Sequence, residues 1–184
     1  MNGNLIVLSG PSAVGKGTLA SFIIGNYENF ELSVSATTRS ARSGEVAGES
    51  YFFVSDEEFS RLIESDELLE WATVHGKHRY GTPRLPVENA LAKGRNVVLE
   101  IDVQGAFQVK KAFPAALLVF VNPPSFQELE ARMNKRGTET PEDKLLRLET
   151  AQSELLQAES FDFQVINDEV ARCAQEVVDL VKSN

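Results

Sequence analysis

Short apolar runs alternate along the chain with segments of helical period. The runs expected to form core strands are Leu5–Ser9, Leu32–Thr37, Asn96–Ile101, Ala116–Val121 and Phe163–Asn167. Apolar residues follow one another in most of these runs, most clearly in Leu5–Ser9 and Ala116–Val121, as in strands when helices cover both faces of their sheet. Strands that alternate with helices are typical of βαβ units, so the pattern predicts an α/β fold with a mostly parallel sheet.

Polar residues beside the helical segments predict where helices begin. Ser55 is followed three residues later by Glu58, and Ser125 is followed in the same way by Glu128. This spacing is a capping box, in which the serine accepts a hydrogen bond from the first turn of the helix. Pro141 suits the first position of a further helix.

Two stretches interrupt the alternation. Residues 35–80 are rich in Gly, Arg, Ser and Thr, and they contain a short run, Tyr51–Val54, that we expect to be a strand. Residues 125–157 are highly charged and mostly of helical pattern. We expect both stretches to be excursions from a compact α/β core.

Composition limits the class of protein. A chain of 184 residues with 42% apolar and 24% charged residues fits one folded domain. No apolar run approaches the roughly 20 residues that cross a bilayer, and the first residues do not resemble a signal peptide. The single cysteine excludes an internal disulfide, so we expect a cytoplasmic location and no membrane partner.

The net charge of −9 argues against nucleic acid as a partner, because such binding needs a basic face. Anions would have to be bound by locally focused positive groups. An oligomer is compatible with the sequence.

The segment GPSAVGK, residues 10–16, follows the first predicted strand and precedes a helix expected to begin near Lys16. Glycines let the backbone turn its N–H groups around a phosphate, and the helix N-terminus and Lys16 supply positive charge. A glycine-rich turn without a ligand is the alternative. The place of the segment, at the first strand–helix junction, favours a nucleotide-phosphate loop.

The residue after the lysine departs from the general pattern. That pattern has Ser or Thr there, as a hydroxyl ligand of Mg²⁺, but here the residue is Gly17 and the hydroxyl follows at Thr18. The variant resembles kinases that phosphorylate nucleoside monophosphates. The resemblance implies that the threonine binds phosphate and that Mg²⁺ is held through water and the nucleotide, with no direct protein ligand named.

A second cluster of cations suggests a site for another phosphate. Arg39 and Arg42 lie three residues apart in a polar, glycine-containing loop, and Tyr51 follows. Two guanidinium groups and a phenol can bind one phosphate dianion, each charge-assisted bond contributing roughly 1.5–3 kcal/mol. For a single arginine, a solvated surface loop is the simpler explanation.

Over essentially its whole length the chain resembles the guanylate kinase family. The pieces that carry the resemblance are GPSAVGKGT, SATTRSARSGE, YFFVSDEEF, LLEWA, YGT, LEIDVQG, PPS, RGTE and VIND. The resemblance implies transfer of the γ-phosphate of ATP to GMP or dGMP, with Mg²⁺ accompanying ATP, in purine nucleotide metabolism. Ala13 departs from the family, which often has glycine at that place.

The resemblance also implies a binding role for individual residues. The ATP phosphates would be bound by Gly10, Pro11, Ser12, Ala13, Val14, Gly15, Lys16, Gly17 and Thr18, with Asn167 near the adenine. The GMP phosphate would be bound by Arg39, Arg42, Tyr51 and Tyr80, and the guanine by Ser35, Glu70, Thr82 and Asp102.

The chemistry of guanine supports Glu70 independently of the family. Guanine presents N1–H and a 2-amino group on one edge, for which a carboxylate is the matching acceptor. Adenine lacks both donors and would leave Glu70 desolvated and unpaired. Asp102 ends a predicted strand, where ligand groups of open α/β sheets gather. Taken alone, either carboxylate could instead be exposed or cap a helix.

Phosphoryl transfer needs cations around the developing charge. The residues expected to serve as catalytic cations are Lys16, Arg39, Arg132, Arg136 and Arg147. In the family, the segment with the last three is a lid over ATP; a helical hairpin with a solvated basic face is the alternative.

The expected architecture is a P-loop parallel sheet core flanked by helices, with a small β-rich GMP-binding insertion and a helical lid. The core would comprise 1–34, 83–124 and 158–184, the insertion 35–82 and the lid 125–157, all in one kinase domain. Two rival functions remain: a kinase whose main acceptor is AMP, UMP or dGMP, and a non-catalytic scaffold of the same fold. Scaffolds of this kind usually have damaged phosphate loops, whereas this chain keeps Lys16.

Overall fold

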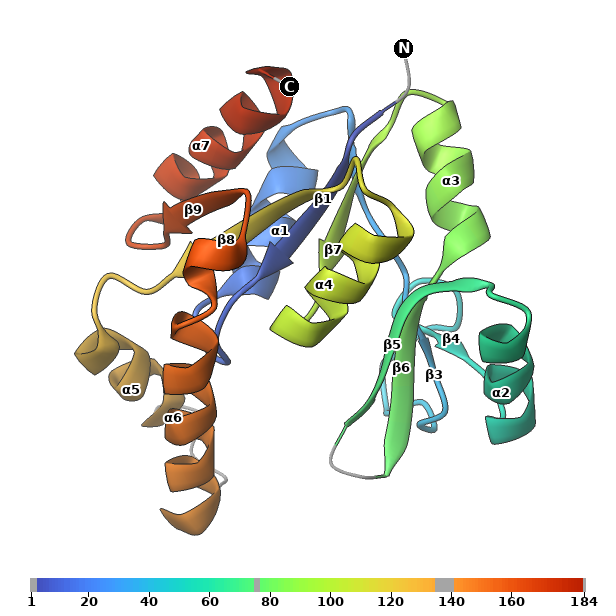
Figure 1. Ribbon diagram of the computed structural model, residues 1–184, viewed down its shortest axis with the longest axis horizontal. Helices are drawn as coiled ribbons and strands as arrows, with labels where there is room; N and C mark the ends of the chain where they lie inside the picture. The colour runs from blue at the N-terminus through green and yellow to red at the C-terminus, as the bar shows by residue number, and fades with distance from the viewer. Residues whose placement is uncertain (1–2, 75–76, 135–140, 184) are drawn as a thin grey trace.

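The computed structural model describes residues 3–74, 77–134 and 141–183. Their strands form two sheets that lie side by side (Figure 1). The strands of the larger sheet lie parallel, in the order β2 (Phe30–Leu32), β7 (Asn96–Glu100), β1 (Leu5–Ser9), β8 (Leu117–Asn122) and β9 (Phe163–Ile166). This is the predicted α/β fold with a parallel core. Apart from the run at residues 32–37, each predicted strand is found within one residue of its expected bounds.

Helices cover both faces of the larger sheet. They are α1 (Lys16–Asn26) and α7 (Val170–Ser183) on one face, and α3 (Arg84–Ala92) and α4 (Val103–Ala112) on the other. Side chains of β1 alternate between the two cores: Ile6 and Leu8 pack towards α1 and α7, whereas Leu5 and Val7 pack towards α3 and α4. Because both faces are buried, the strand is apolar at these four consecutive positions.

The expectation of one strand over Leu32–Thr37 is wrong. The chain forms β2 in the larger sheet and then β3 (Ala36–Thr37) in the smaller sheet. Ser33 N still donates to Val98 O (3.0 Å), and Ser35 O already accepts from Phe52 N (2.9 Å), so residues 33–35 cross from one sheet to the other. Backbone hydrogen bonding looks alike in either sheet, so local pattern could not reveal the crossing.

The smaller sheet has the strand order β4 (Phe52–Phe53), β3, β6 (His78–Pro83) and β5 (Leu68–Val74). Helix α2 (Asp56–Glu64) packs on it through a small apolar core of Ala36, Phe59 and Leu68. The short strand expected near Tyr51–Val54 is present as β4. The sequence pattern did not predict β5 or β6.

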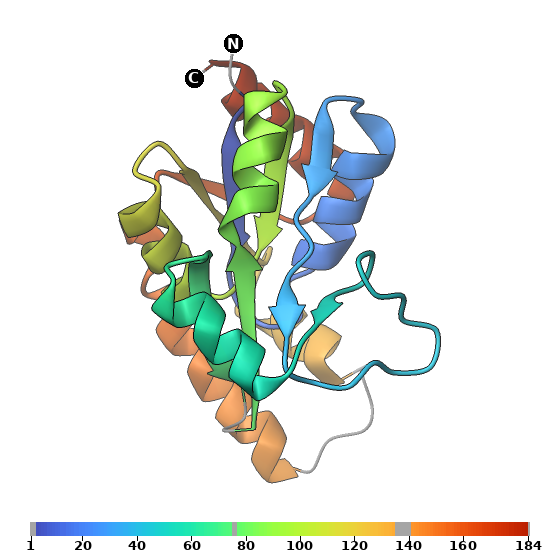
Figure 2. The ribbon, with the colours of Figure 1, turned by 90° about the vertical axis from the view of Figure 1, so that its right-hand side faces the viewer.

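The charged stretch after β8 is helical, as predicted. It contains α5 (Phe126–Asn134) and α6 (Pro141–Leu155), and a short 3₁₀ turn, Ala158–Ser160, leads on to β9. Figures 1 and 2 show α6 and the smaller sheet extending beyond the same end of the larger sheet, where the strand arrows point. Ligand sites of open α/β sheets form at this carboxyl end.

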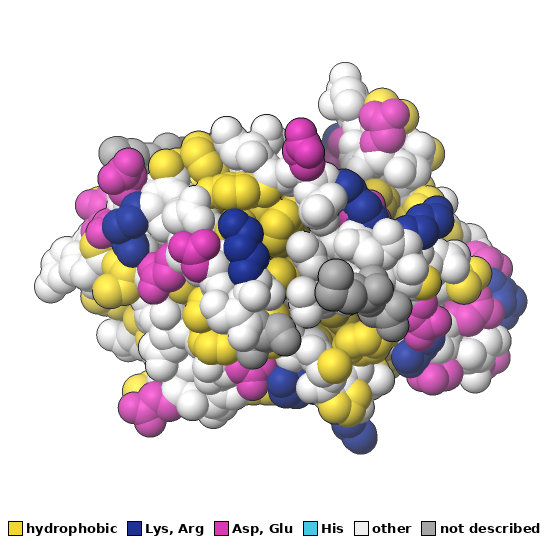
Figure 3. All heavy atoms as spheres, turned by 90° about the horizontal axis from the view of Figure 1, so that it is seen from above, with side chains coloured by type: hydrophobic (Ala, Val, Ile, Leu, Met, Phe, Trp, Pro, Cys, Tyr) yellow, Lys and Arg dark blue, Asp and Glu magenta, His cyan; other side chains and the backbone are white. Residues whose placement is uncertain are grey.

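Helix starts follow the predicted caps. Ser55 Oγ accepts from Glu58 N (3.1 Å) and Ser125 Oγ accepts from Glu128 N (3.1 Å). On the face seen in Figure 3, Lys and Arg side chains are scattered among acidic ones rather than gathered into one patch. Among the described residues, no helix is both long enough and apolar enough to span a bilayer.

Candidate active site

The loop after β1 has a backbone that demands glycine at two places. Gly10 has φ 138° and Gly15 has φ 100°, which side-chain-bearing residues rarely adopt. A Cβ on Gly10 would lie 2.4 Å from Val121 O, and one on Gly15 would lie 2.6 Å from Asn167 Nδ2. Ala13 also has a positive φ, 66°, at the place where the family that the chain resembles often has glycine.

The loop leads directly into α1, as expected of a phosphate-binding loop. No side chain caps the first turn of α1, so its N–H groups remain available to an anion. Lys16 Nζ folds back across the loop and donates to Gly10 O (2.6 Å) and Pro11 O (3.2 Å). Its positive charge therefore lies over the concave side of the loop.

The far side of the loop is held by two polar side chains. Asn167, at the end of β9 and 6% exposed, donates from Nδ2 to Val14 O (2.9 Å). Arg132, on α5, donates to Val14 O (3.1 Å) and to Asn167 O (3.3 Å). The predicted Arg132 and Asn167 thus lie together at the loop. Arg147 lies on α6, and Arg136 falls outside the described residues.

Helix α6 contributes a carboxylate that sequence reasoning did not single out. Glu154, near the end of α6, is half-buried, and burial raises its pKa, while the charge of Lys16 and a hydrogen bond from the Ser12 backbone oppose the rise. This carboxylate therefore brings the last turn of α6 against the phosphate loop. An acidic residue in a charged helix gives no local sign of such a contact.

Arg39 is held in a fixed orientation by its neighbours. Its Nη1 and Nη2 atoms donate to the two carboxylate oxygens of Glu45 (2.9 and 2.8 Å), and its Nε donates to Tyr80 Oη (3.2 Å). The guanidinium also lies 5.3 Å from the centre of the Tyr51 ring. Three of the residues predicted to bind the acceptor phosphate are therefore in contact.

Glu45 was missed as a site residue, although it ends the motif SATTRSARSGE. It also accepts from Arg42 N (2.7 Å). The hydrogen bonds from Arg39 and from the Arg42 backbone lower the pKa of Glu45 to about 2, so the carboxylate stays charged. An acidic residue three positions after an arginine, in a loop rich in arginine, was the available signal.

Glu70 and Thr82 form a buried pair in the smaller sheet. The antiparallel register of β5 and β6 sets them opposite each other, and Thr82 Oγ1 donates to Glu70 Oε1 (2.7 Å). They are 6% and 1% exposed. Burial raises the pKa of Glu70 to about 7; the charge of Asp102 adds to the rise, and the bond from Thr82 opposes it. A buried carboxylate is thus available to a ligand that donates hydrogen bonds.

Asp102 caps a helix and also lies near Glu70. Its Oδ1 caps α4 by accepting from Gly105 N (2.7 Å). A Cβ on Gly105 would meet Glu70 Oε2 at 3.0 Å and Asp102 Oδ1 at 3.3 Å, so both carboxylates lie beside this glycine. Asp102 also lines a cavity of about 730 Å³ between β5, α4 and α6. Ser35, Tyr51 and Thr82 share the lining of a smaller cavity of about 110 Å³.

A phosphate loop at the carboxyl end of a parallel sheet, with a second cluster of polar side chains around Arg39 at the smaller sheet, defines a P-loop phosphotransferase. Comparison with known proteins narrows the class. Residues 2–184 match the family model described as guanylate kinase. The chain belongs to the guanylate kinase family, enzymes that phosphorylate GMP to GDP at the expense of ATP.

Individual relatives agree with this assignment. The guanylate kinase of Leifsonia xyli subsp. xyli is 54% identical over 178 residues, which cover 97% of this chain and 70% of that protein. The guanylate kinase of Nocardia farcinica is 51% identical, with 98% and 94% covered. The crystal structure of guanylate kinase from Anaplasma phagocytophilum superposes with a TM-score of 0.77 at 34% identity, covering 99% of this chain and 86% of that one.

Proposed function

We propose that this chain transfers the γ-phosphoryl group of ATP to GMP or dGMP in the cytoplasm, with ATP bound at the loop of residues 10–18 and the acceptor at the smaller sheet. In this proposal residues 35–82 form the GMP-binding insertion, 125–157 the lid, and 1–34, 83–124 and 158–184 the core. The buried Glu70–Thr82 pair beside Asp102 is the observation that carries the proposal, because it presents carboxylate oxygens to a base edge with two N–H donors.

The acceptor phosphate would bind between Arg39, Arg42, Tyr51 and Tyr80. Arg39 uses its fork on Glu45 and its Nε on Tyr80, so its orientation is set before the nucleotide arrives. Tyr80 Oη accepts from Arg39, which leaves its own O–H to donate to a phosphate oxygen. The guanine would then reach Ser35, Glu70 and Thr82 in the same insertion, and Asp102 at the edge of the core.

The transfer itself requires alignment and charge neutralisation. An oxygen of the acceptor phosphate attacks the γ-phosphorus in line; one P–O bond forms, the bond to the β-phosphate oxygen breaks, and ADP leaves. The attacking oxygen is already anionic, so no strong general base is needed. Lys16, Arg39 and the lid arginines Arg132, Arg136 and Arg147 would balance the charge on the transferring group.

The polar groups at the loop fit Mg²⁺ bound with ATP. Among the described residues no cluster of three His, Cys, Asp or Glu side chains could hold a metal, but Mg²⁺ commonly keeps several waters and binds through phosphates. Thr18 begins the exposed face of α1, and the Glu100 carboxylate lies 3.1 Å from where a Cβ of Gly17 would stand. Thr18 and Glu100 would hold the ion through water, and the ion would neutralise phosphate charge.

A panel of acceptors tests the proposal. ADP release is measured by a coupled assay with GMP, dGMP, AMP and UMP as acceptors. We expect GMP to have the highest kcat/KM and Lys16→Ala to lose turnover while remaining folded. A higher kcat/KM with AMP would overturn the guanine assignment, and absence of turnover with every acceptor would favour the scaffold.

A further inference from the structure

Helix α4 belongs to the core, yet it borders the strand that carries Glu70. Asp102, Gly105 and Gln108 follow one another at intervals of three along α4, so they lie along one side of the helix. Asp102 caps the helix, and Gly105 leaves room for the Glu70 carboxylate. Gln108 is a third contact along the same line, and neither the family motifs nor the mechanism uses it.

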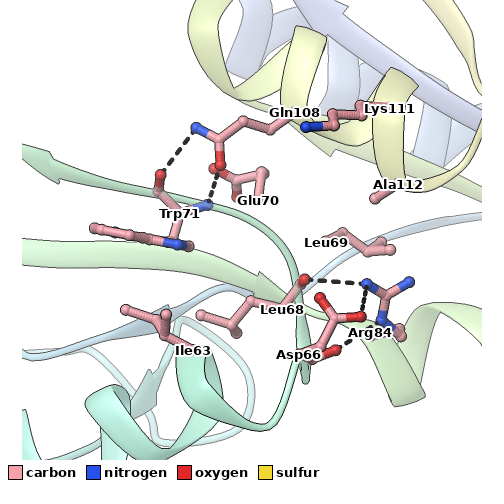
Figure 4. A pocket seen from close by; sticks show the side chains of 10 residues that line it. All are labelled: Ile63, Asp66, Leu68, Leu69, Glu70, Trp71, Arg84, Gln108, Lys111 and Ala112. Carbon is pink, nitrogen blue, oxygen red and sulfur yellow. Dashed lines mark hydrogen bonds and ion pairs between the residues drawn. The ribbon is translucent and has the colours of Figure 1, made fainter.

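The side-chain amide of Gln108 pairs with the backbone of β5. Its Oε1 accepts from Trp71 N (3.1 Å), and its Nε2 donates to Trp71 O (3.1 Å) (Figure 4). β5 ends the strand order of the smaller sheet, so its outer backbone groups need other partners. A planar amide donates and accepts at once, and Gln108 therefore replaces one peptide of a neighbouring strand.

The residue it binds is the one next to Glu70. Fixing both polar groups of the Trp71 backbone fixes the strand on which the Glu70 carboxylate stands. Beside that carboxylate, a Cβ at Gly105 would be only 3.0 Å from Oε2. Helix α4 thus constrains Glu70 at two points, through Gln108 and Gly105, and provides Asp102 from its own N-terminus.

We propose that Gln108 is a positioning residue for guanine recognition, which holds β5 against α4 so that Glu70 and Asp102 keep one fixed spacing. The inference rests on the proposed role of these two carboxylates as guanine ligands. Gln108 itself does not touch the nucleotide. If Gln108 only tied the insertion to the core, its loss would raise KM for ATP and KM for GMP alike. If it positions Glu70 and Asp102, its loss should raise KM for GMP alone, through recognition of the guanine base.

The test compares Gln108→Leu with Lys111→Leu, one turn further along α4. Both side chains line a cavity of about 440 Å³ beside Trp71 (Figure 4). Loss of two hydrogen bonds predicts a rise of about tenfold in KM for GMP, with KM for ATP and kcat within about twofold of wild type. Inosine monophosphate lacks the 2-amino group, so the preference for GMP over it should fall in Gln108→Leu only. Lys111→Leu should match wild type in every measurement.

A double-mutant cycle shows whether Gln108 acts through Glu70. In a Glu70→Gln background, Gln108→Leu should change KM for GMP by less than about twofold, because the group it positions is already altered. Full additivity, an equal loss for ATP and GMP, or an unchanged preference over inosine monophosphate would each overturn the inference.

Gly105→Ala provides an independent variant if Gln108→Leu folds poorly. Alanine favours the helix, so a structural role predicts a protein at least as stable and as active as wild type. The positioning role predicts that KM for GMP rises in Gly105→Ala while KM for ATP stays unchanged. If Gly105→Ala, Gln108→Leu and the wild type had equal KM values for GMP, the positioning role would be refuted. If the wild type did not prefer GMP in the acceptor panel, the proposed function itself would be wrong. If the wild type preferred GMP but Gln108→Leu and Gly105→Ala behaved like wild type, only the present inference would be wrong.

Discussion

At the scale of the residue, the site depends on carboxylates whose surroundings differ. Glu45 is charged because two donors hold it, whereas burial raises the pKa of Glu70 to about 7. If guanine binds at Glu70 as proposed, its N–H donors need the carboxylate ionised, so the protonation of this one side chain should control binding of the acceptor. Three predictions concern these two residues.

Activity with GMP should depend on the titration of Glu70. The profile of kcat/KM for GMP against pH should fall as the pH drops below about 7, because the free enzyme then binds a proton at the acceptor of guanine. The phosphate of GMP also titrates, at about pH 6. Glu70→Gln should have a much lower kcat/KM for GMP. Its pH profile should lose the step near about pH 7 and keep the step near about pH 6 that comes from the phosphate. A wild-type profile that is flat between about pH 6 and 7 would contradict the assignment.

The same shift predicts a change in stability. The folded-state pKa of Glu70 is above its ordinary value of 4.5, so its stabilising contribution is fully present below about pH 4.5 and is lost as the pH rises through 7. At about pH 8, Glu70→Gln without nucleotide should therefore be more stable than wild type, by on the order of 2–3 kcal/mol. Urea unfolding should show this gain vanishing near about pH 5; a variant less stable at both pH values would mean that Glu70 is needed for packing.

Glu45 should matter to the acceptor through Arg39. Glu45→Gln loses the charge that pairs with the guanidinium fork, so KM for GMP should rise by about tenfold while KM for ATP stays unchanged. Glu58→Gln, which alters an exposed ion pair with Arg61 on α2, is the matched control. A lower KM for GMP in Glu45→Gln would show instead that the carboxylate repels the phosphate.

At the scale of the element, the phosphate loop is shaped by contacts with other strands. A methyl group at Gly15 would displace Asn167, which holds Val14 O. The positive φ of Gly10 and its approach to Val121 O fix the other end of the loop in the same way. The glycines are thus required by contacts with Val121 of β8 and with Asn167, which follows β9.

Gly15→Ala should therefore raise KM for ATP by about tenfold or more and destabilise the protein by about 1–3 kcal/mol. Gly25, in the last turn of α1, has nothing within 4 Å of the point where a Cβ would stand, and Gly25→Ala should be neutral or stabilise the protein by up to about 1 kcal/mol. Steady-state kinetics and thermal unfolding of Gly15→Ala and Gly25→Ala test this difference. Equal KM for ATP and equal stability in the two variants would show that the loop tolerates a side chain at residue 15.

At the scale of the whole molecule, α6 and the smaller sheet extend beyond the same end of the larger sheet and border one cavity. In the proposed mechanism, the cations of the lid act only when the two substrates have met. Arg147→Ala should accordingly lower kcat by about tenfold or more and change either KM less. An effect confined to KM for ATP would make Arg147 a ligand of the bound nucleotide rather than of the transition state.

Local sequence determined most of the core. The continuous apolar runs of β1, β7 and β8 are found where they were expected, because strands buried on both faces leave a pattern that depends on neighbouring residues alone. The phosphate loop was recognisable for a similar reason, since its glycines, lysine and helix start lie within a few residues. The helix caps at Ser55 and Ser125 are equally local.

Contacts between distant segments were decided by the tertiary structure. The run from residue 32 to 37 crosses from one sheet to the other, and the pairing of Glu70 with Thr82 depends on a hairpin that has no strong alternation. Glu45, Glu154 and Gln108 have ordinary polar surroundings in the sequence and acquire a role only from what folds against them. The sequence by itself determined a parallel core and a phosphate loop, because those follow from burial and backbone geometry over short spans; only the tertiary structure decided how the carboxylates are buried and held, because that depends on side chains brought together from separate elements.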